Sequence, residues 1–470
     1  MNKAPLLEEL LKYKSENNLI LSMPGNKSGK GFLRDKLGRR LKDSLGELDI
    51  TEVDPLDNLH NPEGVIKEAQ ELLAKTYKVK KAYFLVNGSS SGNLAAIFSA
   101  FNEGDEVLVE RNCHKSIYNA LILRKLKVIY IDAVVDNNLG IFLPPREEEI
   151  NDALEKAKSP KGIILTNPNY FGVYYDLEKT IEKLRKEGLK VIIDSAHGAH
   201  FGFNDKLPKS MATLGDYVVV SAHKTLPSLT QGAFLLLNSV DDNIEFYLKA
   251  FMTTSPSYLI MASLDYSRYY LDNYSKDDYD NLIEMAEKYR QDINSLNKVY
   301  IVSNKDMEEK YKIDKSRYLM TVRDGYSGHK LLEYLRSKKI QAEMSFGKGV
   351  VLILSPSNTE VDFEKIYLAI KDLNIDLLKT EENIIEFSKS YPKKILEPYE
   401  VFNFKYKYIS LDNSLDKISN EFIVPYPPGI PVVCPGEKIT SEVIDIIRNY
   451  IDNKLSVIGL EDNRIKVLDI

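Results

Sequence analysis

The chain has 470 residues, enough for two or three domains, and its 43% hydrophobic and 28% charged residues are typical of a globular protein. Its net charge of −6 is spread over mixed charges, which argues against a nucleic-acid-binding surface, and no apolar run is long enough to span a membrane. The two cysteines, Cys113 and Cys434, lack metal-ligand spacing and suit a reducing compartment, so no metal site is expected.

The N-terminal stretch 1–18 has the pattern of a short amphipathic helix and lacks the apolar core of a signal peptide, so we expect a cytoplasmic protein. Residues 23–31 (MPGNKSGKG) are rich in glycine and lysine, but their order does not match a P-loop. A flexible, solvated loop is expected there. Apolar residues at helical spacing then predict a helix from Val65 to Tyr77.

A strand, a Gly/Ser turn and a helix are predicted in succession after residue 83. The strand Tyr83–Val86 is followed by a turn with three serines, Ser89, Ser90 and Ser91, and then by a helix rich in alanine and leucine. The free N–H groups at a helix start and the helix dipole favour a phosphate, and the hydroxyls add further donors. The sequence therefore predicts an anion site here, with an ordinary capped helix as the alternative.

The next predicted strand ends in front of a histidine. Residues 107–110 form the strand, and His114 stands at the start of the following helix. A histidine at that point can stack flat on an aromatic ring. A purely structural histidine is the alternative, and we expect Cys113 beside it to be packed in the core.

Residues 161–200 have the pattern of a complete β-α-β unit. A strand at 163–166 leads to a helix that ends near Gly188, and a second strand ends at Asp194. Asp194 thus lies at the carboxyl end of a strand, where ligands bind in open α/β sheets, although a helix N-cap is an alternative. His197 follows three residues later, and His200 is expected to be a core histidine bonded to the backbone.

The stretch 216–238 is predicted to contain two buried strands joined by a polar hinge. The first strand, Tyr217–Val220, brings Ser221, His223 and Lys224 to the point where it ends, and residues 232–237 resume the sheet. A buried lysine amine at such a point loses its proton readily and can form a Schiff base. A surface lysine would be the usual alternative for a lysine on its own.

Lys224 is paired with Asp194 on a separate strand, and the pair indicates a cofactor. Pyridoxal phosphate needs a lysine that holds its aldehyde and an acid that keeps its ring nitrogen protonated. The hydrogen bond between such an acid and the protonated ring nitrogen is charge-assisted and contributes about 1.5–3 kcal/mol. The two residues together therefore favour a pyridoxal phosphate site over the separate structural alternatives.

Five stretches of the chain resemble the ornithine/lysine/arginine decarboxylases, which are fold-type-I pyridoxal phosphate enzymes. The segment SAHKTLPSLTQGA around Lys224 is similar to their lysine-attachment signature. The other four occur in the family's order and are TEVDPLDNLHNPEG (51–64), FLVNGSSSGN (84–93), ERNCHKS (110–116) and VPYPPGIPVVCPGE (424–437). One departure is Asn26, which stands where the family usually has a histidine, and we assign it no catalytic role.

The resemblance implies a role for each candidate residue. Lys224 would hold the cofactor, Asp194 its ring nitrogen, and His114 would stack on its ring. Ser89, Ser90 and Ser91 would bind its phosphate, with Ser221 and His223 on the other side. His197 would donate to the ring oxygen or contact the substrate.

The expected fold is α/β, with a fold-type-I large domain around a mostly parallel sheet and a smaller α/β C-terminal domain. We expect an N-terminal arm at 1–50, a cofactor-binding domain at 51–297 and a C-terminal domain at 298–470, which a charged surface helix and linker at 379–400 divides further. One long helix at 275–296 crosses between the two domains. The family's active sites form between subunits, so the resemblance also implies at least a homodimer.

The resemblance implies decarboxylation of arginine, lysine or ornithine to the amine and carbon dioxide, in polyamine metabolism, without a nucleic-acid or membrane partner. The compact length favours arginine or lysine, with arginine first. An aminotransferase or a side-chain lyase on the same fold is an alternative, because the residues that hold the cofactor serve those reactions too. A non-catalytic cofactor-binding protein is a further alternative, which an intact Lys224 and Asp194 argue against.

Overall fold

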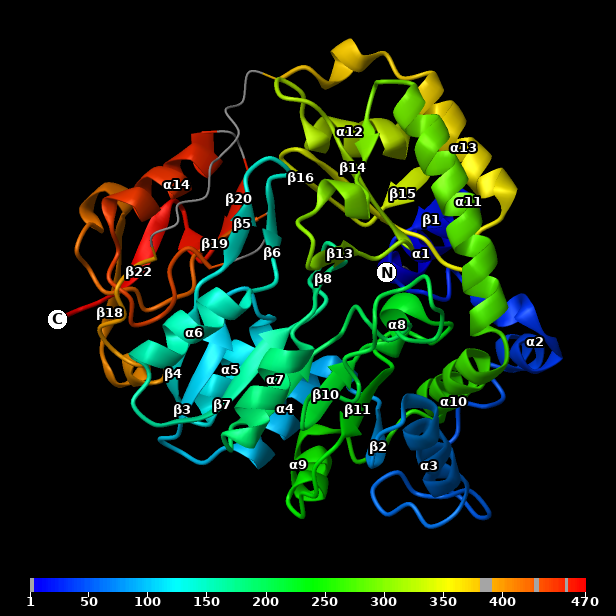
Figure 1. The fold of residues 1–470 in the computed structure, drawn as a ribbon, viewed down its shortest axis with the longest axis horizontal. Coiled ribbons are helices and arrows are strands. Elements are labelled where there is room, and N and C mark those ends of the chain that lie inside the picture. Colours follow the sequence, from blue (N-terminus) through cyan, green and yellow to red (C-terminus); the bar gives the residue numbers. More distant parts are fainter. Residues whose placement is uncertain (1–3, 381–390, 427–430, 453–454) are drawn as a thin grey trace.

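The computed structural model describes residues 4–380, 391–426, 431–452 and 455–470. Three hydrophobic cores organise most of these residues. In Figure 1 the large sheet lies in the lower half of the view, a smaller sheet with long helices at the upper right, and the C-terminal part at the left in orange and red.

A seven-stranded sheet in the order β2-β11-β10-β9-β7-β3-β4 forms the largest core. Only β11 runs antiparallel to its neighbours, so the expected mostly parallel sheet is confirmed. Its strands are short runs rich in β-branched and aromatic residues, as expected for strands covered on both faces. Their bounds are β2 Lys81–Leu85, β3 Glu106–Glu110, β4 Lys127–Ile131, β7 Pro160–Thr166, β9 Lys190–Asp194, β10 Tyr217–Val220 and β11 Ala233–Leu237.

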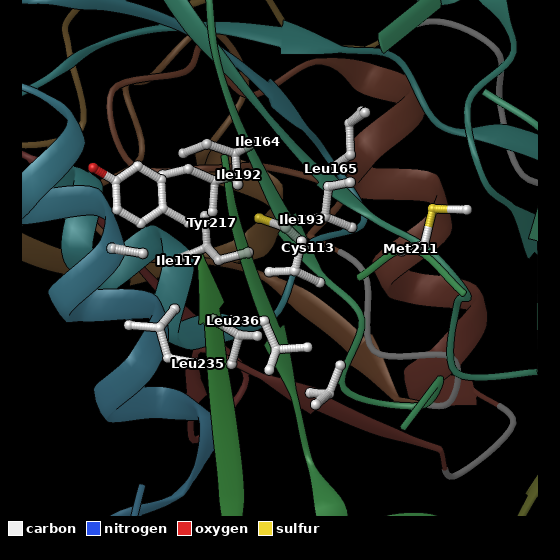
Figure 2. Packing of buried hydrophobic residues seen from close by; sticks show 14 of the residues in the cluster. Cys113, Ile117, Ile164, Leu165, Ile192, Ile193, Met211, Tyr217, Leu235 and Leu236 are labelled. Carbon is white, nitrogen blue, oxygen red and sulfur yellow. The ribbon is translucent and has the colours of Figure 1, made fainter. Parts of the chain in front are cut away.

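Helices surround this sheet, and small residues let one of them approach it closely. A Cβ atom on Gly92 would lie 2.5 Å from Leu85 and 3.2 Å from Val219, so glycine is needed where α4 packs on the sheet. Figure 2 shows core side chains from β7, β9, β11 and α5, among them Ile164, Ile192 and Leu235. The helices are α3 Val65–Tyr77, α4 Gly88–Ala100, α5 Lys115–Leu123, α6 Glu147–Lys156, α7 Glu178–Lys186, α8 Ala222–Thr225, α9 Ile244–Phe251 and α10 Tyr258–Asn273.

A second core lies around an antiparallel sheet in the order β12-β14-β17-β16. Strand β1 (Leu19–Leu21) from the N-terminal arm pairs in parallel with β15 (Ile340–Ala342) and joins this core. The other elements between residues 275 and 371 are β12 Tyr300–Ile301, β13 Tyr311–Ile313, β14 Arg317–Thr321, β16 Met344–Phe346, β17 Gly349–Ile353, α11 Ser275–Ser295, α12 Gly328–Ser337 and α13 Glu360–Lys371. Helices α1 (Pro5–Ser15) and α2 (Lys36–Asp43) flank β1 in the chain.

The C-terminal part has a third, smaller core. It contains α14 Ser441–Asp452 and the strands β18 Tyr406–Ser410, β19 Val424–Tyr426, β20 Ser456–Ile458, β21 Leu460–Glu461 and β22 Arg464–Leu468. A buried ion pair ties it to the large sheet: Arg111, just after β3, donates to both carboxylate oxygens of Glu437 at 2.8 and 2.7 Å. The helix expected within 379–400 falls mainly on residues 381–390, outside the described part of the chain.

Two further pairs of short strands belong to the large core. Strand β8 (Val173–Tyr175) pairs antiparallel with β13, whose Tyr311 and Ile313 pack in the same core. Strand β5 (Val134–Asp136) pairs antiparallel with β6 (Ile141–Leu143). Among the described residues, no helix combines the length and apolar character that a membrane crossing requires.

Candidate active site

Lys224 lies just beyond the carboxyl end of β10, as the sequence predicts. The chain leaves the strand at Val220 and turns into the single helical turn α8, which carries His223 and Lys224. The amine Nζ of Lys224 is 3.0 Å from Nε2 of His197. Lys224 and His197 are therefore brought into direct contact.

Asp194 ends the neighbouring strand β9 and is only 2% exposed. Its Oδ1 accepts a hydrogen bond from the Ala196 N–H at 3.1 Å, and its Oδ2 accepts one from Asn93 Nδ2 at 2.9 Å. These two hydrogen bonds hold the carboxyl group in one orientation. Asn93, the last residue of the FLVNGSSSGN motif, was not singled out in the sequence, although the motif contained it.

His114 is connected to Asp194 through side chains of α4 and α5. Asn93 Nδ2 also donates to Ser116 Oγ at 3.0 Å, and that hydroxyl lies 2.8 Å from His114 Nδ1. The Ser116 N–H donates to the same nitrogen at 3.2 Å, so His114 caps α5. The histidine is thus both a cap and part of the network around Asp194, and the residue as a whole is exposed.

The three serines lie in the first turn of α4, as expected, beside the loop that follows Lys224. Ser91 donates to the Gly88 carbonyl at 2.8 Å, while Ser89 and Ser90 are half-buried. Gln231 Nε2, in the loop after Lys224, donates to the Val86 carbonyl at 2.6 Å. The helix start and the Lys224 loop therefore approach each other.

Several buried oxygen atoms around Lys224 have no hydrogen-bond partner among the described residues. They include Ser195 Oγ, Ser221 Oγ and Thr225 Oγ1. Unpaired buried polar groups are costly and point to a ligand or a functional role. His223, by contrast, contacts the Gly232 carbonyl through Nδ1 at 3.0 Å.

Burial and nearby positive charges lower the pKa values of both Lys224 and His197. Burial lowers the pKa of Lys224; Asp194 opposes this effect, and the cation of Arg317 adds to it. Burial also lowers the pKa of His197 well below its usual value, and the positive charges of Lys224 and Arg317 lower it further. A lysine in this state is a better nucleophile than a solvated one.

The expectation of a flexible, solvated loop at 23–31 is wrong. The Gly25 N–H donates to the His223 carbonyl at 2.7 Å, and Asn26 Nδ2 donates to the Ser228 carbonyl at 2.8 Å. A Cβ on Gly25 would lie 2.6 Å from the Thr225 carbonyl carbon, so the loop packs directly on the turn that carries Lys224.

Lys27 is the least expected residue of this loop, because it is only 2% exposed. Its ammonium donates to the carbonyls of Ser22 at 2.5 Å and Ile353 at 2.9 Å. Burial lowers the pKa of Lys27 to about 7, with Glu343 opposing the change. The loop thus connects the Lys224 turn with the end of β17 through buried hydrogen bonds, which its glycine- and lysine-rich composition did not reveal.

His200 is buried as expected, but its partners are side chains and not the backbone. Its Nε2 is 3.1 Å from Asp314 Oδ2 and 3.1 Å from Ser316 Oγ, and its ring stacks on Tyr279 at 5.3 Å between centroids. Burial alone would raise the pKa of Asp314. Its interactions with His200, Arg317 and Ser316 outweigh burial and lower that pKa to about 2.

Asp314 is expected to make the stability of the protein depend on acid. Its folded pKa of about 2 is below its usual 3.8, so its contribution is complete above about pH 4 and is lost as the pH falls through 2. This amounts to about 2 kcal/mol. Urea unfolding of the natural chain and of Asp314→Asn should be measured at a series of pH values. The difference between their free energies of unfolding should shrink by that amount as the pH falls through 2. Asp324→Asn, at an exposed carboxylate, is the control; a difference for Asp314→Asn that does not vary with pH would contradict the assignment.

Two cavities of about 320 and 750 Å³ lie away from this cluster. The smaller lies against α3, β2 and α9, and its lining includes Lys81 and Glu245. The larger lies near the start of α11. Neither lining contains Lys224, Asp194 or His197, so the candidate site is defined by its side-chain network and not by cavity size.

The sequence matches two family descriptions in chain order. Residues 4–320 match "Orn/Lys/Arg decarboxylase, major domain", and residues 387–458 match "Orn/Lys/Arg decarboxylase, C-terminal domain". The first match alone covers more than half of the chain. The protein therefore belongs to the Orn/Lys/Arg decarboxylase family, which confirms the resemblance and the expected enzyme class, a pyridoxal phosphate-dependent amino acid decarboxylase.

Similar proteins from bacilli span nearly the whole chain. The YaaO protein of Bacillus subtilis is 34% identical over 97% of this chain and 96% of its own length. The arginine decarboxylase of Bacillus anthracis is 30% identical over 99% and 97%. The lysine decarboxylase of Hafnia alvei is more distant, with 24% identity over 93% of this chain and 73% of its own length.

Solved structures share the fold. A lysine decarboxylase of Francisella novicida has a TM-score of 0.79 at 22% identity and covers 99% of this chain and 81% of its own. The serine palmitoyltransferase of Sphingomonas wittichii has a TM-score of 0.57 at 16% identity, with coverage of 75% and 86%. These likenesses confirm the expected fold class.

Proposed function

We propose that the protein is a cytoplasmic, homodimeric arginine decarboxylase that supplies an amine for polyamine synthesis. The observation that carries the site assignment is the contact between the Lys224 amine and His197, with Asp194 at the end of the adjacent strand. Arginine is the proposed substrate because relatives named arginine decarboxylase match nearly the whole chain at 30% identity.

The residues around Lys224 fit pyridoxal phosphate. The unpartnered hydroxyls of Ser221 and Thr225 are available to a phosphate, and the first turn of α4 with its serines offers N–H groups and a favourable dipole. The Asp194 carboxyl group is buried and held in one orientation, so it can accept a hydrogen bond from a protonated ring nitrogen. We propose the complete set as the cofactor site: Ser89, Ser90, Ser91, His114, Asp194, His197, Ser221, His223 and Lys224.

The bound cofactor supplies an electron sink for the electron pair that carbon dioxide leaves behind. Lys224 provides a nucleophilic amine, because burial and the nearby Arg317 favour its neutral form. Asp194 stabilises a positive ring nitrogen, held in place by Asn93 and the Ala196 N–H. His114, Asp194, His197 and Lys224 are thus the proposed catalytic residues.

A proton must be returned to the substrate Cα after carbon dioxide leaves. Lys224 and His197 are the two proposed donors of that proton, and their atoms Nζ and Nε2 lie 3.0 Å apart.

We also propose the domain division at 1–50, 51–297 and 298–470. The pairing of β1 with β15 shows that part of the proposed arm is built into the second core.

The test is mass spectrometry of products after the purified protein, loaded with pyridoxal phosphate, is given arginine, lysine and ornithine separately. The expected result is an amine lighter than arginine by one carbon dioxide, formed faster than the amines from lysine and ornithine. A faster reaction with lysine or ornithine would correct the substrate only. A keto acid without any amine would overturn decarboxylation in favour of an aminotransferase.

A further inference from the structure

Arg317, at the start of β14, reaches from the second core to the back of His197. It is only 2% exposed, and its Nη2 lies 3.0 Å from His197 Nδ1, on the opposite side of the ring from Lys224. No motif in the sequence pointed to this residue, because the arginine stands in an ordinary strand far from Lys224 in the chain.

The guanidinium of Arg317 is fixed by three kinds of partner. Besides His197, it donates to the Tyr170 carbonyl through Nη1 at 2.7 Å and contacts Asp314 through Nε at 3.4 Å. Space for it depends on Gly172, since a Cβ there would lie 2.5 Å from Arg317 Cδ, and Gly172 has a positive φ of 81°. The contact with His197 is therefore held by surrounding structure.

The direction of the hydrogen bonds follows from the proton content of arginine. A guanidinium in a protein only donates, so His197 Nδ1 must offer its lone pair to Arg317. A neutral imidazole that accepts at Nδ1 carries its proton on Nε2. The 3.0 Å contact between Nε2 and Lys224 Nζ is then a donation from His197 to a neutral amine.

We propose that Arg317 is a positioning residue that fixes the proton of His197 on Nε2 and thereby presents a hydrogen-bond donor to the Lys224 side of the ring. This inference rests on the proposed function, since it assigns the support for that site. With its proton on Nε2, His197 can donate a hydrogen bond to the ring oxygen of the cofactor. The tautomer with the proton on Nδ1 is excluded while Arg317 is in place.

The charges around both residues are consistent with this arrangement. Arg317 lowers the pKa of His197 and of Lys224, while Asp194 and Glu343 raise that of Lys224. The other groups that face His197 are His114 and His223, and both lower its pKa. Arg317 thus acts on the pair through both a directed hydrogen bond and its charge.

The experiment separates these two effects with Arg317→Met and Arg317→Lys. The first removes donor and charge, and the second keeps the charge but not the planar donor. Nitrogen-15 solid-state NMR of the histidine-labelled full chain reports which ring nitrogen of His197 carries the proton, and His197→Asn identifies its signals among six histidines. Competitive acetylation over a pH series, read by mass spectrometry of the Lys224 peptide, reports the pKa of the amine in cofactor-free protein.

We expect the natural chain to show protonated Nε2 and bare Nδ1. Arg317→Met should show mixed tautomers and a raised pKa of Lys224, because the cation that lowers this pKa is gone, and thus slower acetylation at a given pH below that pKa. Arg317→Lys should show mixed tautomers with a smaller change in the pKa. Gly172→Ala, which displaces the guanidinium but keeps its charge, is a second route to the same tautomer change if Arg317→Met does not fold.

Arg323→Met, at an exposed arginine of the same part of the chain, is the matched control and should leave both signals unchanged. Protonated Nδ1 in the natural chain, or an unchanged His197 spectrum in folded Arg317→Met, would overturn the proposal. An unchanged spectrum with a raised KM would instead assign Arg317 to substrate binding. The NMR and acetylation measurements use no substrate turnover, so they fail independently of the product analysis that tests decarboxylation.

Discussion

Lys224→Ala will eliminate amine formation, with turnover reduced on the order of 10³-fold or more. The variant loses the nucleophilic amine that contacts His197, and no other described lysine ends a strand beside Asp194. Its fold should be intact, because truncating this side chain removes one contact with His197 and leaves the buried core of the sheet unchanged. The measurements are amine formation and borohydride reduction of cofactor-loaded protein, which should leave no cofactor attached to the peptide around residue 224.

Lys305→Ala is the matched control, since Lys305 is exposed and far from Lys224 along the chain. It should decarboxylate at the rate of the natural chain and keep its attached cofactor after reduction. If Lys224→Ala retained the natural rate of amine formation, the central assignment of the site would have to be abandoned.

Glu437→Ala will lower the free energy of unfolding by about 3–5 kcal/mol, the usual cost of leaving a buried charge without its partner. Arg111 and Glu437 are each about 1% exposed and form a two-pronged ion pair. Glu437 also accepts a hydrogen bond from the Cys434 N–H at 2.7 Å. The pair is therefore a main attachment of the C-terminal part, and urea unfolding followed by circular dichroism should show the loss.

The double variant Arg111→Met/Glu437→Leu removes both charges and should recover most of that stability, because apolar residues of similar size can replace a buried pair. Glu103→Ala breaks the exposed pair with Lys125 and should cost only about 0–1 kcal/mol. If Glu103→Ala and Glu437→Ala lowered the free energy of unfolding equally, burial would not determine the cost of breaking an ion pair in this protein.

Local sequence patterns predicted much of the fold. The strands Tyr217–Val220 and Lys190–Asp194 and the helix Val65–Tyr77 have the predicted bounds, because each depends on a run of apolar residues with one clear period. The pairing of β1 with β15 was not predictable, since it joins Leu19 to Ile340 and neither segment contains a signal for its partner. The domain boundaries stay a prediction.

The candidate site was predictable only where a motif contained it. Lys224 and Asp194 follow buried strands, and polar residues at strand ends are informative. Arg317, Asp314 and Lys27 are ordinary charged residues in the sequence and become notable only because tertiary structure buries them. Charged residues are usually exposed, so composition alone argues against such burial.

The order in which the ribosome makes the chain has a consequence for the pairing of β1 with β15. Strand β1 leaves the ribosome early. Its partner β15, and the Ile353 carbonyl that accepts a hydrogen bond from Lys27, are synthesised only after most of the chain. Contacts over such sequence distances form late and leave apolar surface exposed in the meantime. The nascent chain therefore cannot complete the hydrogen bonds that connect the Lys224 turn with β17 until Ile353 has been synthesised.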